Sequence, residues 1–282
     1  MNGQAQEGKM ARGWRLTKVA WELIRREPTM VSIALIGSGF GLAGTAAIFY
    51  FSGYFNSPGH SGRAVAVAAL IALYPMTFLS VFFNVALAGA AAASFDGRPI
   101  GVREALGISW KRVGQIAQWA LLAAGVGFIL EQLASRIPGF GRIASWLLGA
   151  AWSLATIFAV PLLALEGPGP LETAKASVNL IKGKWGEGIT GLVGIGAWTI
   201  VATIPIAALF AAGLLVNHQN PNLGAALIAI AVGGFLLVTA LSLATREVFA
   251  VALYRYANGS TATGGFAEAD LAEPFSRRGK GD

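Results

Sequence analysis

Long apolar runs, separated by short polar stretches, dominate the sequence. They fall at 30–51, 64–95, 113–132, 143–165, 188–216 and 223–256. A helix rises about 1.5 Å per residue and the hydrocarbon core of a bilayer is about 30 Å thick, so about 20 apolar residues suffice for one crossing. Each run reaches that length. The pattern therefore predicts six transmembrane helices, with both ends of the chain on the same side of the membrane.

The second and sixth runs are longer than one crossing needs. Residues 64–95 would form a helix of about 50 Å, which must tilt, bend or extend beyond the bilayer. Pro75 is the expected bend, because a proline inside a helix removes one backbone hydrogen bond. Pro161 and Pro205 fall inside the fourth and fifth runs in the same way. We expect kinks at all three positions.

A basic, amphipathic segment precedes each pair of apolar runs. In the second segment Val102, Ala105 and Leu106 recur at helical spacing, opposite Glu104 and Lys111, and the other two segments follow the same pattern. These segments are too short and too charged to cross the bilayer, so we expect helices that lie in the interface. The cations expected to contact anionic lipid are Arg15, Lys18, Arg25, Lys111, Arg112, Lys182 and Lys184.

Each pair of runs ends in a polar residue followed by glycine: Asp96-Gly97, Glu166-Gly167 and Asn258-Gly259. Glycine is typical just after a helix because it adopts positive φ without steric cost. The sequence thus indicates an internal repeat of an interfacial helix and a two-span hairpin. We predict an all-α membrane protein with one integral membrane domain over 1–282. Its parts are repeats 14–96, 97–166 and 167–259 and a cytoplasmic tail 260–282.

Composition excludes a water-soluble protein. Hydrophobic residues make up 55% of the chain and charged residues 12%, and the mean hydropathy is +0.61, whereas soluble domains carry about 25% charged residues. The net charge of +7 would suggest nucleic acid as the partner of a soluble protein. Here the cations flank apolar runs, so we expect anionic lipid and no nucleic acid. Cysteine is absent, which excludes disulfides and thiolate chemistry.

The distribution of cations predicts the orientation. If the three amphipathic segments and both termini share one side, 18 of the 21 Lys and Arg lie there, and Arg63, Arg136 and Arg142 lie opposite. Lys and Arg concentrate on the cytoplasmic side of membrane proteins. Both termini are therefore expected in the cytoplasm.

Three polar residues in the spans form a candidate cluster: Asn84, Arg246 and Glu247. Ionisable groups inside a membrane are costly and often functional. Asn84 and Arg246 each precede a repeat end by twelve residues, so they are expected at equal depth. We favour a structural cluster in which Arg246 bonds a neighbouring helix and Glu247 pairs with Arg112 or Lys184. A role in a transport pathway is the alternative.

Other motifs do not predict a catalytic, cofactor or metal site. GFGLAG at 39–44 matches a dinucleotide fingerprint, but it lies inside a span, where small residues serve helix packing. His60 and His218 lack the further ligands that a metal site needs. SPGHSG offers serine and histidine without an acid to orient the imidazole.

Three stretches resemble an uncharacterised prokaryotic six-span family, domain-of-unknown-function family 6159. They are FFNVALAGAA, AWSLATIFAVPLLALEGPGPLETAKASVNLIKGKWGE and ALYRYANG…GGF. The three-hairpin plan is also similar to the membrane domain of some glycerophosphodiester phosphodiesterases. The resemblance implies a bacterial or archaeal plasma membrane. It implies no activity, since the phosphodiesterase chemistry resides in a separate soluble domain.

The sequence leaves three functional hypotheses. We favour a non-enzymatic membrane protein that contacts anionic lipid as a scaffold or modulator, alone, as a homo-oligomer or with another membrane protein. The second hypothesis is a transporter or lipid-handling protein for an apolar or lipidic cargo, supported by the prolines inside the spans. An intramembrane enzyme has the least support, because the polar residues form no catalytic constellation.

Overall fold

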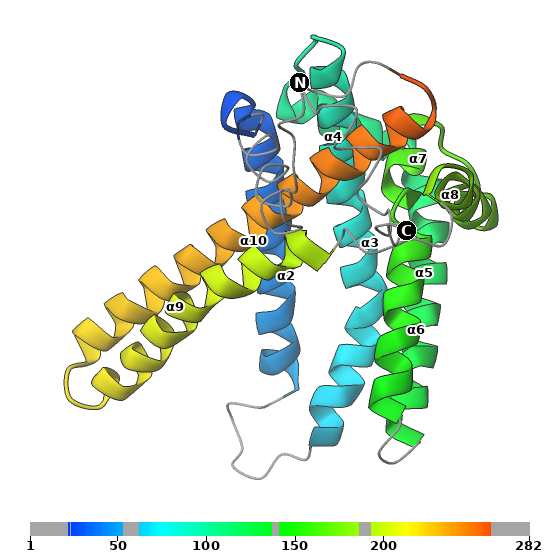
Figure 1. Ribbon diagram of the computed structural model, residues 1–282. Coiled ribbons are helices and arrows are strands. Elements are labelled where there is room, and N and C mark those ends of the chain that lie inside the picture. The colour runs from blue at the N-terminus through cyan, green and yellow to red at the C-terminus, as the bar shows by residue number, and fades with distance from the viewer. Residues whose placement is uncertain (1–21, 23, 53–61, 137–140, 186–192, 261–282) are drawn as a thin grey trace, which may run out of the picture.

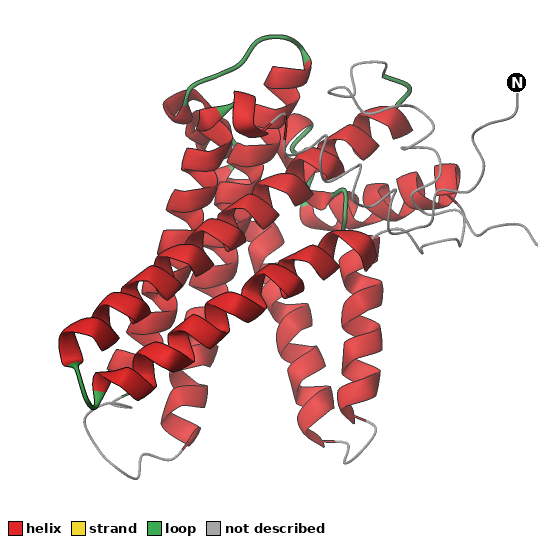
Figure 2. Cartoon of the chain, turned by 60° about the vertical axis from the view of Figure 1, so that its left-hand side comes forward, coloured by secondary structure: helices red, strands yellow, loops and turns green. Residues whose placement is uncertain are grey.

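The computed structural model describes residues 22, 24–52, 62–136, 141–185 and 193–260, and every regular element in these ranges is a helix (Figures 1 and 2). The prediction of an all-helical chain is confirmed for this part. The helices are α2 (Pro28–Phe51), α3 (Gly62–Phe95), α4 (Val102–Lys111), α5 (Val113–Arg136), α6 (Gly141–Ala155), α7 (Ala159–Leu165), α8 (Pro170–Trp185), α9 (Val193–Asn217) and α10 (Pro221–Ala257).

Four of these helices are long and apolar enough to cross a membrane: α2, α3, α5 and α10. Within α3 the candidate span is Ala64–Phe95, and α10 supplies 37 residues, close to the expected bounds of the second and sixth runs. Shorter apolar segments are Ile143–Ser153 in α6 and Val201–Asn217 in α9. The described residues thus support four spans by length and composition, with two shorter apolar helices at the fourth and fifth positions.

The fourth run is two helices rather than one. Helix α6 ends at Ala155 and α7 begins at Ala159, with a break between them. Pro161 explains the break, because it has no N–H to bond the carbonyl of Ile157 and its ring crowds that turn. The backbone N–H of Phe158 donates instead to Ser177 Oγ of α8 at 3.2 Å. An interhelix bond therefore stabilises the point where the helix is interrupted.

The long helices diverge from one end of the molecule. In Figure 1, α2, α3, α5 and α6 run side by side, and α4, α7 and α8 lie around their upper end. The α9–α10 hairpin crosses the others diagonally, and its tip stands apart from them in both views (Figures 1 and 2). We call the end that contains α4, α7 and α8 the base, and α9 with residues 221–240 of α10 the arm.

The buried core lies in the base. Nearly every residue of α3 from Val81 to Ala93 is buried, as is α10 from Val248 to Tyr254. Ile33 and Ala34 of α2 and Leu163 of α7 complete this cluster. The far halves of α3 and α10 expose apolar side chains, for example Ile71 at 73% and Ile230 at 63%. Protein therefore covers the helices at one end and leaves them bare at the other.

The glycines at the three repeat ends have the predicted geometry. Gly97, Gly167 and Gly259 have φ of 68°, 71° and 77°, and they are the described glycines with positive φ. At the end of α3, Arg98 N–H donates to Ala93 O and Gly97 N–H to Ser94 O, which closes the last turn. The same pair of bonds recurs at the end of α10. The expected helix stops at these glycines are confirmed.

Candidate functional site at the base

The end of α10 binds the end of α3 through a paired ion contact. Arg255 donates from Nη1 to Asp96 Oδ1 at 2.6 Å and from Nη2 to Asp96 Oδ2 at 2.8 Å. Its Nη2 also donates to the carbonyl of Ala92 at 2.9 Å, and its guanidinium lies 5.7 Å from the ring centroid of Phe95. A planar guanidinium suits this bidentate geometry. The hydrogen bond from Arg255 lowers the pKa of Asp96 below its ordinary value of 3.8.

The same end of α10 also binds the end of α7. The Tyr254 hydroxyl donates to Glu166 Oε1, and the Tyr254 ring lies 6.4 Å from that of Phe158. Asn258 caps the end of α10 four residues after Tyr254. Two adjacent residues of α10 therefore bind the acids that end the first and second predicted repeats. One turn of one helix joins all three repeat ends.

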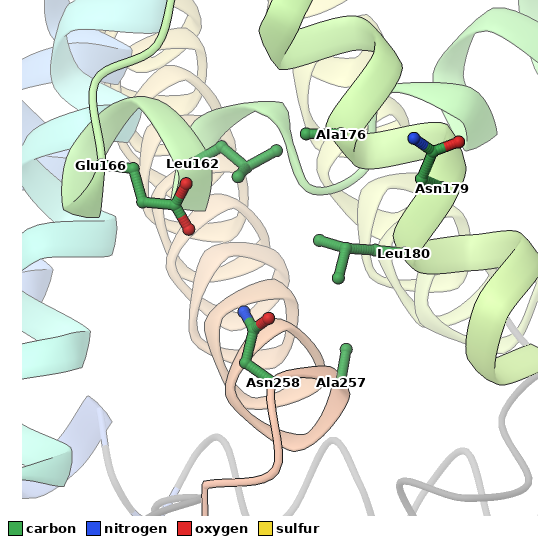
Figure 3. A pocket seen from close by; sticks show the side chains of 7 residues that line it. All are labelled: Leu162, Glu166, Ala176, Asn179, Leu180, Ala257 and Asn258. Atoms are coloured by element: carbon green, nitrogen blue, oxygen red, sulfur yellow. The ribbon is translucent and has the colours of Figure 1, made fainter.

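An open pocket of about 450 Å³ lies beside this junction, between α7, α8 and the end of α10 (Figure 3). Leu162, Leu180, Ala176 and Ala257 supply apolar lining, and Glu166, Asn179 and Asn258 supply polar groups. In Figure 3 the Glu166 carboxylate and the Asn258 amide point toward the space between them. No ion pair to Glu166 occurs among the described side chains. The pocket can therefore offer a carboxylate and an amide to a small polar group, over an apolar floor.

The candidate polar cluster is dispersed over different surroundings. Asn84 is half-buried, and its Oδ1 is buried without a hydrogen-bond partner in the described part of the chain. Glu247 is 4% exposed and its Oε2 likewise has no described partner, whereas Arg246 is exposed. The expected pairing of Glu247 with Arg112 is not present. The Arg112 guanidinium lies instead against Gly167, where a Cβ would collide with it.

The predicted lipid-contacting cations lie at the base where they are described. Arg25, Lys111 and Lys182 are exposed, and Arg112 is half-buried. The amphipathic segments around Lys111 and Lys182 form the separate helices α4 and α8. Arg15 and Lys18 lie outside the described residues, and the Lys184 side chain does too, although its backbone is part of α8. Contact with lipid stays a prediction.

Sequence reasoning missed Tyr254 and Arg255 as the residues that join the hairpins. Both residues stand near the predicted end of the sixth run, and the sequence pattern assigned neither of them a partner. The available signal was the acid at Asp96 and Glu166, each of which needs a partner if the ends of the hairpins meet. Only the packing of α10 across α3 and α7 identifies the partners of the two acids, which are the Arg255 guanidinium for Asp96 and the Tyr254 hydroxyl for Glu166.

The motifs that predicted no chemistry can be placed in part. Gly44 of the GFGLAG stretch packs on Met76, because a Cβ there would collide with the Met76 sulfur, as expected for helix packing. His218 is exposed at the end of the arm, and His60 lies outside the described residues. The residues that the structure describes contain no group of three His, Cys, Asp or Glu side chains that could hold a metal ion.

Comparison with known proteins adds a family without an activity. The model of a family described as "Family of unknown function (DUF6159)" matches residues 64–266. No curated protein matches the chain.

Proposed function

The chain belongs to this family of unknown function, and from that premise we propose that it is a non-enzymatic integral membrane protein whose base binds anionic lipid headgroups and acts as a scaffold or modulator. Six spans in three repeated units would place both termini in the cytoplasm. The resemblance of the three-hairpin plan to the membrane domain of some phosphodiesterases supports a prokaryotic plasma membrane.

The exposed cations of the base are the observation that carries this proposal. Arg103, Lys111, Lys175 and Lys182 project from α4 and α8, the two helices at the outside of the base. At the opposite ends of the helices, the described side chains include one cation, Arg136. A basic residue near an anionic membrane surface contributes about 1 kcal/mol of attraction. The base is therefore suited to rest on the headgroups of one leaflet.

Thermal stabilisation by lipid tests the headgroup contact. We expect phosphatidylglycerol to raise the melting temperature of the full-length protein in detergent more than phosphatidylcholine does. The triple variant Lys111→Gln, Lys175→Gln, Lys182→Gln should lose most of that difference, which should also shrink with salt. Arg136→Gln is the matched control and should keep it. An unchanged lipid preference in the triple variant, or an equal loss in the control, would contradict the proposal.

Reporter fusions test the orientation. Fusions after Gly59 and Asn220 should report an extracytoplasmic position, and fusions after Gly101 and Gly169 a cytoplasmic one. The break between α6 and α7 makes the fourth span the critical one, because a failure to cross there would put positions 101 and 169 on opposite sides. A cytoplasmic signal at position 59 would refute the first hairpin.

The pocket beside Glu166 favours lipid handling as a second candidate function. Its apolar floor and its carboxylate suit a phospholipid headgroup that carries an amine. Under this candidate, phosphatidylethanolamine should co-purify with the protein, and Glu166→Gln should reduce its share against Glu104→Gln as a control. An equal share in both variants would leave the pocket without a role in lipid selection.

A further inference from the structure

Glu247 is a buried acid on a helix whose neighbours are largely apolar. It is 4% exposed, and Oε2 has no hydrogen-bond partner among the described residues. Helices α2, α3, α7, α8 and α9 pack against α10. The sequences of α2, α7 and α9 contain no Asp, Glu, Lys, Arg or His.

The other described charged side chains on the packed helices point away from Glu247 into solvent or headgroups: Glu172, Lys175 and Lys182 of α8 are exposed. Arg63 is the second residue of α3, at the end far from the base, and its side chain and that of Lys184 lie outside the described residues. Arg246 lies about 100° around the α10 axis from Glu247, and it is exposed. A carboxylate in apolar surroundings is retained only when its charge is neutralised. A small cation is therefore the simplest way to satisfy this group.

Helical periodicity places Glu247 on the face of α10 that turns toward α7. Glu247 and Tyr254 are two turns apart and share a face of α10, about 10 Å apart along the axis. Tyr254 on that face contacts Phe158, the residue at the start of α7. Along α10, Glu247 lies further from the base than Tyr254 does. Along α7, Phe158 likewise lies further from the base than Glu166 does. Glu247 thus lies on the α7 side of α10, toward the level at which α6 and α7 separate.

Two further oxygen atoms are available at this level. Asn84 shares a face of α3 with Phe95, three turns away, and Phe95 lies under Arg255 of α10. That face of α3 therefore turns toward α10, and the buried Oδ1 of Asn84 has no described partner. Pro161 leaves the carbonyl of Ile157 without its helical donor. Carboxylate, amide and interrupted-helix carbonyl oxygens are suited to small hard cations.

We propose that Glu247 and Asn84 form an intramembrane site for one small cation, a proton or a monovalent metal ion such as Na⁺, beside the break between α6 and α7. This goes beyond the scaffold function, which needs no such site. A proton and a monovalent metal ion each supply a single positive charge to a buried carboxylate and its neighbouring oxygen atoms. The site would bind its ion among α3, α10 and the interrupted fourth helix.

Carbodiimide labelling of the full-length protein in detergent tests the site and separates the two sources. Dicyclohexylcarbodiimide reacts with protonated carboxyl groups in apolar surroundings, and peptide mass spectrometry identifies the residue modified. We expect modification of Glu247 that decreases as pH rises, with little modification of exposed Glu104. If Na⁺ replacing choline slows the labelling several-fold, the metal ion binds; if it has no effect, the proton is the ligand. An unlabelled Glu247, or labelling independent of both pH and Na⁺, would overturn the proposal.

Variants test the two residues separately. Glu247→Gln should make the melting temperature insensitive to Na⁺ and to pH, apart from effects shared with the control Glu104→Gln. If Glu247→Gln does not fold, Asn84→Ala retains the carboxylate and should shift the pH or Na⁺ concentration at half-maximal labelling several-fold. An unchanged midpoint in Asn84→Ala, or undiminished sensitivity in Glu247→Gln, would refute the two-residue site. If the wild-type protein shows no preference for phosphatidylglycerol but keeps these responses, the scaffold proposal alone is refuted.

Discussion

The base and the arm are both built from apolar helices, yet protein covers one and not the other. In the base, Leu163 and Leu253 are 0% exposed, and polar pairs such as Ser109 Oγ with Phe82 O at 2.7 Å join neighbouring helices. In the arm, the beginning of α10 packs on α9 through close approaches at Gly213 and Gly224, while Ile230 is 63% exposed. Similar hydropathy thus serves two different environments.

This difference shows which forces stabilise each region. Lipid chains solvate an apolar surface as well as leucine does, so apolar burial adds little to helix association within a bilayer. Close packing at small residues is then the main attraction, as in the arm. The base adds charge-assisted hydrogen bonds and a packed core. We therefore expect substitutions of the same chemical type to have larger effects in the base than in the arm.

The largest contrast should come from two leucine truncations. Leu163→Ala in the base should lower the free energy of unfolding by about 2–4 kcal/mol, because it leaves a cavity in a packed core. Leu215→Ala, at a position 74% exposed in the arm, should cost well under half of that. Melting temperatures in the same detergent measure both. Equal losses would mean that the arm is as fully packed as the base, and would remove the distinction.

Removal of Arg255 should give the next largest effect. Arg255→Gln should cost about 1–3 kcal/mol, because the carboxylate of Asp96 and the carbonyl of Ala92 lose a charged donor. The lower part of that range is expected, since the Asp96 side chain is 57% exposed and water can replace part of the bond. Arg246→Gln is the control in the same helix, and unfolding midpoints compare the two. A larger loss at Arg246 would restore it as the residue that joins the hairpins.

A glycine pair should show a smaller effect. Gly97→Ala should cost about 1–2 kcal/mol, because alanine is strained at φ of 68° even though a Cβ would meet nothing within 4 Å. Gly41→Ala inside α2 has the same open space and an ordinary helical φ, so it should be neutral or slightly stabilising. Thermal melts of the two single variants measure the difference. Equal melting temperatures for the two variants would show that the end of α3 accommodates alanine at position 97 without strain.

The pH dependence of the base should be the smallest effect. Arg255 lowers the pKa of Asp96 in the folded protein, so the unfolded chain binds more protons between that pKa and about 3.8. Stability from this pair is therefore fully present above about pH 4 and is lost as pH falls through the folded pKa. Asp96→Asn should reduce the slope of melting temperature against pH below 4. Glu104→Asn, on exposed α4, is the comparison, and an equal change there would contradict the assignment.

Periodicity and helix-stop residues predicted the fold well where local sequence decides it. The bounds of α2, α3 and α10 and the positive φ at Gly97 follow from apolar runs and from glycine chemistry. A kink was expected at Pro161, but the fourth run is fully interrupted, and the hydrogen bond that stabilises the interruption comes from Ser177 of another helix. Local sequence cannot specify a donor or acceptor that arrives from a distant element.

The candidate site was less predictable for the same reason. Asn84 and Glu247 were identifiable as polar residues in apolar runs, and Oδ1 of Asn84 and Oε2 of Glu247 are buried without described partners. Their surroundings could not be predicted, because hydropathy does not show which face of a helix meets protein and which meets lipid. The role of Arg255 depends on the path of α10 across α3, which tertiary packing determines.

The joining of the hairpins by α10 has a consequence for biosynthesis. Asp96 and Glu166 emerge from the ribosome long before their partners, which follow 159 and 88 residues later. The helices that end beside Asp96 and Glu166 are therefore synthesised before the bonds that join their ends can form. The last helix completes the base. A chain interrupted before Tyr254 would leave Asp96 without Arg255 and Glu166 without Tyr254.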